Sequence, residues 1–233
     1  MRLPPKGYAA RLTSTLAVML AISAQASAQQ TVSFPTSDAG IVYAHLYGAA
    51  NRGVVLAHGG QFTKESWAPQ AERLKNAGFK VLAIDFRGRG RSRGGSGVGA
   101  QDSVHLDVLA AVRYLRRSGA ESVSVVGASF GGGAAAQASV VAQPGEIDRL
   151  VLIAHSSIDQ PEQIKGRALF ITARGDTTGS GALRLPSIHR QFELAPEPKE
   201  LILLEGDAHA QHVFFTPSGE RLMREILRFL AQP

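Results

Sequence analysis

The chain has 233 residues, of which 44% are hydrophobic and 19% charged, a composition typical of a folded globular protein rather than a disordered one. It has no cysteine, which excludes disulfides, thiolate metal sites and a cysteine nucleophile. The formal net charge is +6, and three of the basic residues lie among the first 28, which leaves a surplus near +3 on the rest. So small a surplus does not indicate binding to nucleic acid.

Residues 1–28 have the three parts of a secretory signal peptide. Arg2, Lys6 and Arg11 precede an apolar segment over 12–22, and an Ala-x-Ala exit follows at 26–28. The apolar segment is shorter than the about 20 residues that span a bilayer, so we expect no stable membrane insertion. The alternatives are an uncleaved anchor or an ordinary amphipathic helix. Cleavage after Ala28 predicts a secreted or periplasmic protein with one domain over 29–233.

The rest of the chain alternates short apolar runs with segments of helical apolar spacing. Strands are predicted over 53–57, 80–85, 122–127, 149–154, 167–172 and 200–204, and helices over 67–77, 103–117, 130–142, 182–194 and 218–230. An antiparallel hairpin is predicted from 32–34 and 41–47. Near-continuous apolar strands that alternate with helices indicate the α/β class, with a mostly parallel sheet of about eight strands flanked by helices.

Ligands of open α/β sheets bind beyond the carboxyl ends of the strands, so the residues that follow each run carry the most information. These are His58-Gly59-Gly60-Gln61, Asp85-Phe86-Arg87-Gly88, Ala128-Ser129-Phe130, His155-Ser156-Ser157, Arg174-Gly175-Asp176 and the segment 205–212. A serine, an aspartate and several histidines are thus predicted to meet at one edge of the sheet.

Ser129 has the sequence surroundings of a nucleophile. The run Val123-Ser124-Val125-Val126 leads into Gly127-Ala128-Ser129-Phe130-Gly131 and then into an Ala-rich helical segment. A serine in such a strand–turn–helix is lifted clear of the sheet, and the flanking glycines allow strand and helix to approach closely. The alternative is a Gly-rich turn in which Ser129 only caps the helix.

Serine needs a base to accept its proton, and the base needs an acid to hold it. Asp176 follows the strand predicted over 167–172, and both His209 and His212 follow the strand predicted over 200–204. This is the order serine, acid, histidine of α/β hydrolases. Asp159 and Asp207 are the alternative acids.

From residue 53 onward the chain resembles α/β hydrolases of the dienelactone-hydrolase-like or esterase-like kind. The residues that match are His58-Gly59-Gly60, the stretch 85–92, the serine turn, Gly175-Asp176 and Gly206-Asp207-Ala208-His209. The resemblance implies that His209, in the Gly-x-x-His segment, is the base rather than His212. It also implies an oxyanion hole formed by the backbone N–H of Phe130 and that of Gly60 or Gln61. Dienelactone hydrolases usually carry a cysteine nucleophile, so Ser129 argues against that substrate.

Phe62, Trp67 and His58 are candidates for the pocket, although packing is an equal alternative for Trp67 and shaping of the loop by hydrogen bonds is favoured for His58. Arg87, Arg89, Arg91 and Arg93 form a basic run. The resemblance already accounts for Arg87, and the other three are interpreted as a solvated loop, with attraction of anionic substrates as the alternative. Only a short connection fits between His155 and Arg167, so we expect no large cap and an open cleft.

The sequence therefore predicts a secreted serine hydrolase that cleaves small-molecule carboxylic esters through an acyl-enzyme, with Ser129, His209 and Asp176 as the catalytic residues. The same three residues can cleave amides or thioesters, and a catalytically silent binding protein on this scaffold is a third possibility. The mechanism needs no metal or organic cofactor, and no nucleic-acid partner is expected.

Overall fold

The computed structural model describes residue 1 and residues 29–96, 99 and 102–232, so the predicted signal peptide lies, apart from Met1, outside the described residues. Within the described part, eight strands form one sheet in the order β1-β2-β4-β3-β5-β6-β7-β8. The strands are β1 (Gln30–Pro35), β2 (Ile41–Tyr47), β3 (Arg52–Ala57), β4 (Lys80–Ile84), β5 (Ser122–Ala128), β6 (Arg149–Ile153), β7 (Arg167–Ala173) and β8 (Lys199–Leu204).

The sheet is antiparallel at one edge and parallel elsewhere. β1 and β2 form a hairpin in which Phe34 pairs with Val42, and β2 runs antiparallel to β4. All pairings from β4 through β3, β5, β6 and β7 to β8 are parallel. The predicted class, the mostly parallel sheet of about eight strands and the edge hairpin are therefore confirmed.

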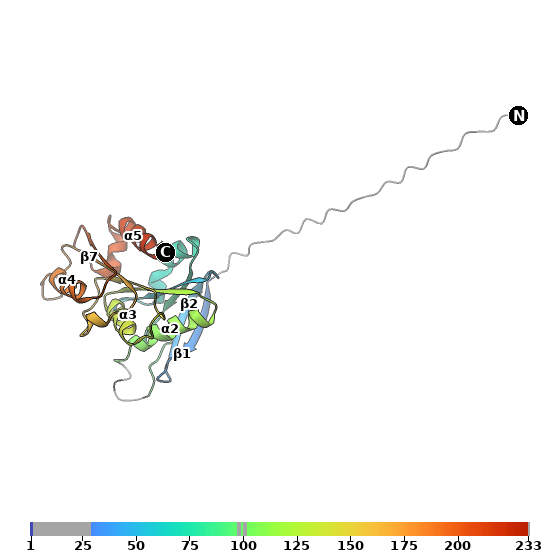
Figure 1. Ribbon diagram of the computed structural model, residues 1–233, viewed down its shortest axis with the longest axis horizontal. Helices are drawn as coiled ribbons and strands as arrows, with labels where there is room; N and C mark the ends of the chain where they lie inside the picture. The colour runs from blue at the N-terminus through green and yellow to red at the C-terminus, as the bar shows by residue number, and fades with distance from the viewer. Residues whose placement is uncertain (2–28, 97–98, 100–101, 233) are drawn as a thin grey trace.

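Helices cover both faces of the sheet (Figure 1). They are α1 (Ala68–Asn76), α2 (His105–Arg117), α3 (Phe130–Val141), α4 (Leu185–Leu194) and α5 (Gly219–Ala231), with short 3-10 turns η1 (Lys64–Trp67), η2 (Pro161–Gln163) and η3 (Ala210–Phe215). α1 and α5 pack on one face, and α2, α3 and the Phe192 side chain of α4 pack on the other. No helix of the described residues is long and apolar enough to cross a membrane.

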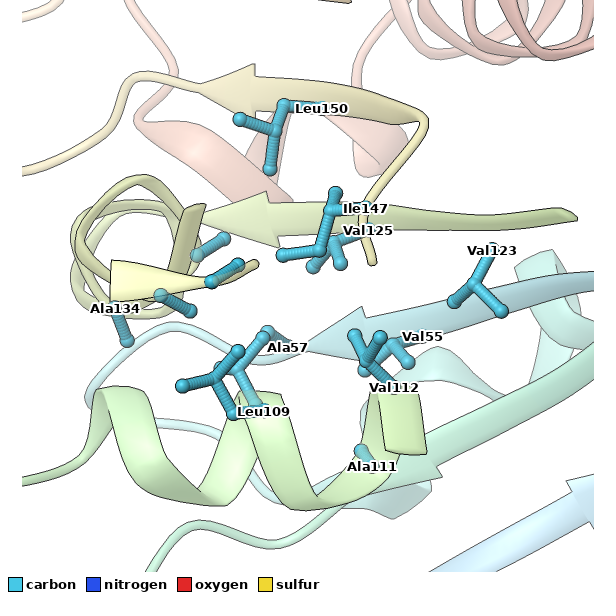
Figure 2. Packing of buried hydrophobic residues seen from close by; sticks show 14 of the residues in the cluster. Val55, Ala57, Leu109, Ala111, Val112, Val123, Val125, Ala134, Ile147 and Leu150 are labelled. Atoms are coloured by element: carbon cyan, nitrogen blue, oxygen red, sulfur yellow. The ribbon is translucent and has the colours of Figure 1, made fainter. Parts of the chain in front are cut away.

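Two hydrophobic clusters, one on each face of the sheet, explain why the strands appear in the sequence as continuous apolar runs. In β3, Val55 and Ala57 contribute to the cluster under α2 and α3, whereas Val54 and Leu56 contribute to the cluster under α1 and α5. Figure 2 shows the first of these clusters, with side chains of α2 directed at Val55 and Ala57. Since side chains alternate along a strand, a sheet covered on both faces requires apolar residues at successive positions.

The connection from β6 to β7 carries only the 3-10 turn η2 and no inserted cap. β6 ends at Ile153 and β7 begins at Arg167, so few residues are present to cover the carboxyl edge of the sheet. The expectation of a fold without a large cap is confirmed, and this edge stays open.

Candidate active site

Ser129 lies on a sharp turn between β5 and α3. Its φ is 51° and its ψ is −116°, a backbone conformation that residues other than glycine rarely adopt. A Cβ atom on Gly127 would lie 2.5 Å from the carbonyl oxygen of Gly131, so glycine is required where strand and helix cross. The strand, turn and helix predicted around Ser129 are therefore present.

Ser129, His209 and Asp176 come together beyond the carboxyl ends of β5, β8 and β7. Nε2 of His209 lies 2.7 Å from Oγ of Ser129, and Nδ1 of His209 lies 2.8 Å from Oδ2 of Asp176. The Asp176 side chain is fully buried, while that of His209 is partly exposed. Among the described residues His209 rather than His212 occupies the position between serine and acid, and the alternative acids Asp159 and Asp207 make no hydrogen bond to it.

A second charged group that the sequence did not indicate lies beside Asp176. Oδ1 of Asp176 is buried without a hydrogen bond, and Nε of Arg184 lies 3.4 Å from it. The backbone N–H of Arg184 donates to the carbonyl of Asp176 at 2.9 Å, which closes the turn between β7 and α4. No local sequence motif marks Arg184, because its contact with Asp176 forms only when the chain folds into this turn.

His58 shapes the loop after β3. The N–H of Phe86 donates to Nε2 of His58 at 3.3 Å, so Nδ1 carries the proton and donates to the carbonyl of Gly59 at 2.8 Å. Burial lowers the pKa of His58, which favours this neutral form. The carbonyl of Gly59 belongs to the same peptide group as the N–H of Gly60. His58 therefore orients the N–H of Gly60, a predicted oxyanion donor. This agrees with the prediction that His58 shapes the loop by hydrogen bonds.

The peptide groups before and after this one are held by other side chains. Arg89 donates through Nη2 to the carbonyl of Gly60, which shares a peptide group with the N–H of Gln61. Oε1 of Gln211 accepts the N–H of Gly59 at 2.7 Å, and its Nε2 donates to Ser66 at 2.9 Å. Gln211 is buried, and the sequence analysis did not single it out.

Phe130 follows Ser129 as the first residue of α3. The N–H groups of a first helical turn have no partner within the helix and carry partial positive charge. The ring of Phe130 packs edge-on against Phe86, with centroids 5.1 Å apart.

A cavity of about 370 Å³ lies over Ser129. The described residues that line it are Gly59, Gly60, Gln61, Phe62, Ser129, Phe130, Arg184, His209, Ala210 and His212. The three residues predicted for the oxyanion hole and one of the three pocket candidates, Phe62, thus line the cavity that holds Ser129 and His209.

Trp67 and His58 do not line this cavity, so the pocket hypothesis is wrong for both. The alternatives given with it, packing for Trp67 and shaping of the loop for His58, agree with the structure. Trp67 is fully buried and packs edge-on against Phe214 at 5.8 Å, because its position on η1 directs it into the core beneath α5. His58 is buried by the hydrogen bonds that hold the loop.

The arginines of the basic run have separate roles. The Arg87 side chain is buried between Asp107 and Asp38, at 2.7 Å from each. Arg91 lies over the ring of Tyr43, 4.3 Å from its centroid. Arg87 is thus a buried structural residue, apart from the other arginines of the run. In the described part of the chain, no three His, Asp or Glu side chains are grouped to hold a metal ion.

The fold and this arrangement define an α/β hydrolase of the serine-hydrolase type. The family model described as serine aminopeptidase, S33 (Hydrolase_4) matches residues 48–174, more than half of the chain, so the chain belongs to this family. The match includes Ser129 and ends before Asp176.

Comparison with other proteins supports the same class. A non-heme chloroperoxidase of Streptomyces lividans is 34% identical over 100 residues, which cover 43% of this chain and 35% of that protein's length. An esterase of Pyrococcus furiosus superposes with a TM-score of 0.68 at 19% identity, covering 87% of this chain and 91% of the esterase. A dienelactone hydrolase of Anabaena variabilis superposes with a TM-score of 0.66 at 19% identity, covering 86% and 95%. The structural matches show the shared fold.

Proposed function

We propose that the protein hydrolyses carboxylic esters through an acyl-enzyme on Ser129, with His209 as the base and Asp176 as the acid that orients it. The observation that carries this proposal is the continuous hydrogen-bonded line from Ser129 Oγ through His209 to Asp176, with distances of 2.7 and 2.8 Å. A serine hydroxyl becomes an effective nucleophile when a base in this position accepts its proton.

In the first step Oγ of Ser129 bonds to the carbonyl carbon while its proton passes to Nε2 of His209. The carbonyl oxygen becomes negatively charged and accepts hydrogen bonds from the N–H of Phe130 and that of Gly60 or Gln61. Loss of one such donor typically costs about 3 kcal/mol of transition-state stabilisation. His209 then donates the proton to the leaving alcohol, and the same base activates the water that releases the acid.

A test of this proposal is labelling with a fluorophosphonate probe beside turnover of 4-nitrophenyl butyrate. We expect Ser129→Ala to abolish labelling and to lower kcat by roughly 10³- to 10⁶-fold, because the remaining groups only bind and polarise the ester. Ser118→Ala, an exposed serine at the end of α2, is the matched control and keeps both signals. A folded wild type that neither reacts with the probe nor turns over ester would contradict the proposal and favour a silent binding protein.

The two histidines are separated by a second pair of variants. His209→Gln is expected to lose far more kcat than His212→Gln, because only His209 hydrogen-bonds to Ser129. Since the family description names an aminopeptidase, amide hydrolysis on the same three residues is the second candidate. Parallel assays with amino-acyl 4-nitroanilides and 4-nitrophenyl esters distinguish the two activities.

We also propose that residues 1–28 direct export and are removed after Ala28, so that the protein acts in a periplasm or outside the cell. Gln29 bonds through its side chain to His45 at 2.7 Å and Tyr47 at 3.3 Å, just before β1 begins at Gln30. Cleavage after Ala28 preserves these contacts. Mass analysis of the exported protein is expected to give Gln29 as the first residue, and retention of residues 1–28 would contradict it.

A further inference from the structure

Among the described residues that line the cavity over Ser129, one is an arginine, Arg184. Its side chain is 28% exposed, at the turn between β7 and α4. None of the described residues that line the cavity is an aspartate or a glutamate. Apart from Arg184, the ionisable side chains that line it are His209 and His212.

The guanidinium of Arg184 is held by one edge only. Nε donates to the carbonyl of Thr177 at 3.2 Å and faces Oδ1 of Asp176 at 3.4 Å. Neither Nη group has a hydrogen-bond partner among the described residues. A guanidinium carries five N–H donors in a rigid fork, so its second edge is left with the geometry that matches a carboxylate.

We infer that Arg184 binds a carboxylate on the substrate, and that the preferred esters of this hydrolase are therefore anionic. The inference rests on the proposed function and names its substrate class. Contact with Asp176 fixes Nε, so the charged fork is positioned before a substrate arrives. No residue of the basic run at 87–93 is among the described residues that line the cavity. Arg87 is engaged by Asp38 and Asp107, Arg89 donates to the carbonyl of Gly60, and Arg91 lies over Tyr43.

Arg184 also contacts the buried acid, so its replacement could act through Asp176 instead of through the substrate. The two effects differ in one measurable way. A change that acts through Asp176 slows all esters by the same factor, whereas loss of a carboxylate contact slows only anionic esters. The ratio of kcat/KM for an anionic ester and its neutral isostere therefore isolates substrate recognition.

The experiment uses two pairs of esters with the mature enzyme. Monomethyl glutarate and methyl valerate place the carboxylate or its methyl replacement in the acyl portion. 4-Acetoxybenzoate and 4-tolyl acetate place it in the leaving group. The variant is Arg184→Gln, and the control is Arg190→Gln, which removes the same charge at an exposed position of α4 outside the cavity.

The wild type is expected to prefer the anionic member of at least one pair, and Arg184→Gln to lower that preference by about tenfold or more, as loss of a charge-assisted hydrogen bond predicts. Arg190→Gln is expected to retain the preference. The pair that responds identifies which portion of the ester carries the carboxylate.

Two results would overturn the inference while the proposed function stands: turnover of neutral esters with no anionic preference in either pair, or an equal loss on both members in Arg184→Gln. Absence of turnover for all four esters by a folded wild type would instead contradict the proposed function, and this inference with it.

Discussion

Gln211 connects two loops of the site that are far apart in the sequence. Its Oε1 accepts the N–H of Gly59, and its Nε2 donates to the hydroxyl of Ser66. Because Gln211 follows His209 by two residues, the loop that carries His209 and the loop that carries the proposed oxyanion donors are fixed to each other. The side chain is buried, so both ends depend on protein partners rather than on solvent.

We expect Gln211→Leu to lower the free energy of unfolding by about 1–3 kcal/mol, because it leaves the buried N–H of Gly59 without an acceptor. We also expect kcat for esters to fall by about tenfold or more, since the oxyanion loop loses its anchor. Urea denaturation and steady-state kinetics measure the two effects. Gln163→Leu, at an exposed position on η2, is the control. Unchanged kcat in Gln211→Leu would contradict a link between the loops.

At the residue scale, the sequence revealed the side chains that a local pattern marks. Ser129 and His209 lie in short motifs, and Asp176 follows a strand at the expected place in the chain order. Arg184 and Gln211 lie in no such motif, because their partners are brought near by the fold. For Trp67 the sequence left pocket lining and packing as equal alternatives, since a position close to the loop at 59–61 does not reveal on which side of η1 a ring points.

Among the elements, the loop after β4 is held to α2 and to the β1–β2 turn by Arg87. Its side chain is buried, and it bonds to Asp107 of α2 and Asp38 of the hairpin turn. The side chain of Asp107 is fully buried. The guanidinium of Arg87 lowers the pKa of Asp38 to about 2, which keeps this carboxylate charged across the neutral range.

Asp107→Asn is expected to lower the free energy of unfolding by about 3–5 kcal/mol, because it leaves the buried charge of Arg87 only partly compensated. The midpoint of urea denaturation reports this change. Glu225→Gln, which removes one of the two carboxylate partners of Arg228 on the surface of α5, is expected to cost less than about 1 kcal/mol. Similar losses in the free energy of unfolding for the two variants would show that the buried ion pair stabilises the protein no more than the surface pair does.

Element boundaries were predictable where burial on both faces enforces apolar runs. β5 was predicted over 122–127 and ends one residue later, at Ala128. α4 was predicted from residue 182 but begins at Leu185, because Thr177 pairs with Leu183 in a narrow turn before the helix. Apolar spacing does not distinguish such a turn from the first turn of a helix.

At the scale of the whole molecule, the pH dependence of the free energy of unfolding is expected to depend on His155. This side chain is buried after β6 and packs edge-on against Phe170 at 5.3 Å. Burial lowers the pKa of His155 to about 4. Between pH 6.5 and 4 the unfolded chain therefore binds a proton at this residue that the folded chain does not, so stability falls as the pH falls through this window.

This residue is expected to contribute a loss of about 3 kcal/mol in the free energy of unfolding between pH 6.5 and pH 4. Urea denaturation at several pH values should show a flatter dependence in His155→Gln, which has no group to titrate there. His189→Gln, at an exposed position on α4, should retain the wild-type slope. Parallel slopes for wild type and His155→Gln would contradict the assignment.

The proposed nucleophile and its proposed base are 80 residues apart, and they meet only when β7 and β8, the last two strands of the sheet, have docked beside β6. A chain that has folded only its first six strands holds Ser129 on its turn but has neither Asp176 nor His209 beside it. If the proposed leader carries the chain unfolded across a membrane, the proposed site is incomplete inside the cell that makes it. The proposed esterase activity would then start only where folding is completed.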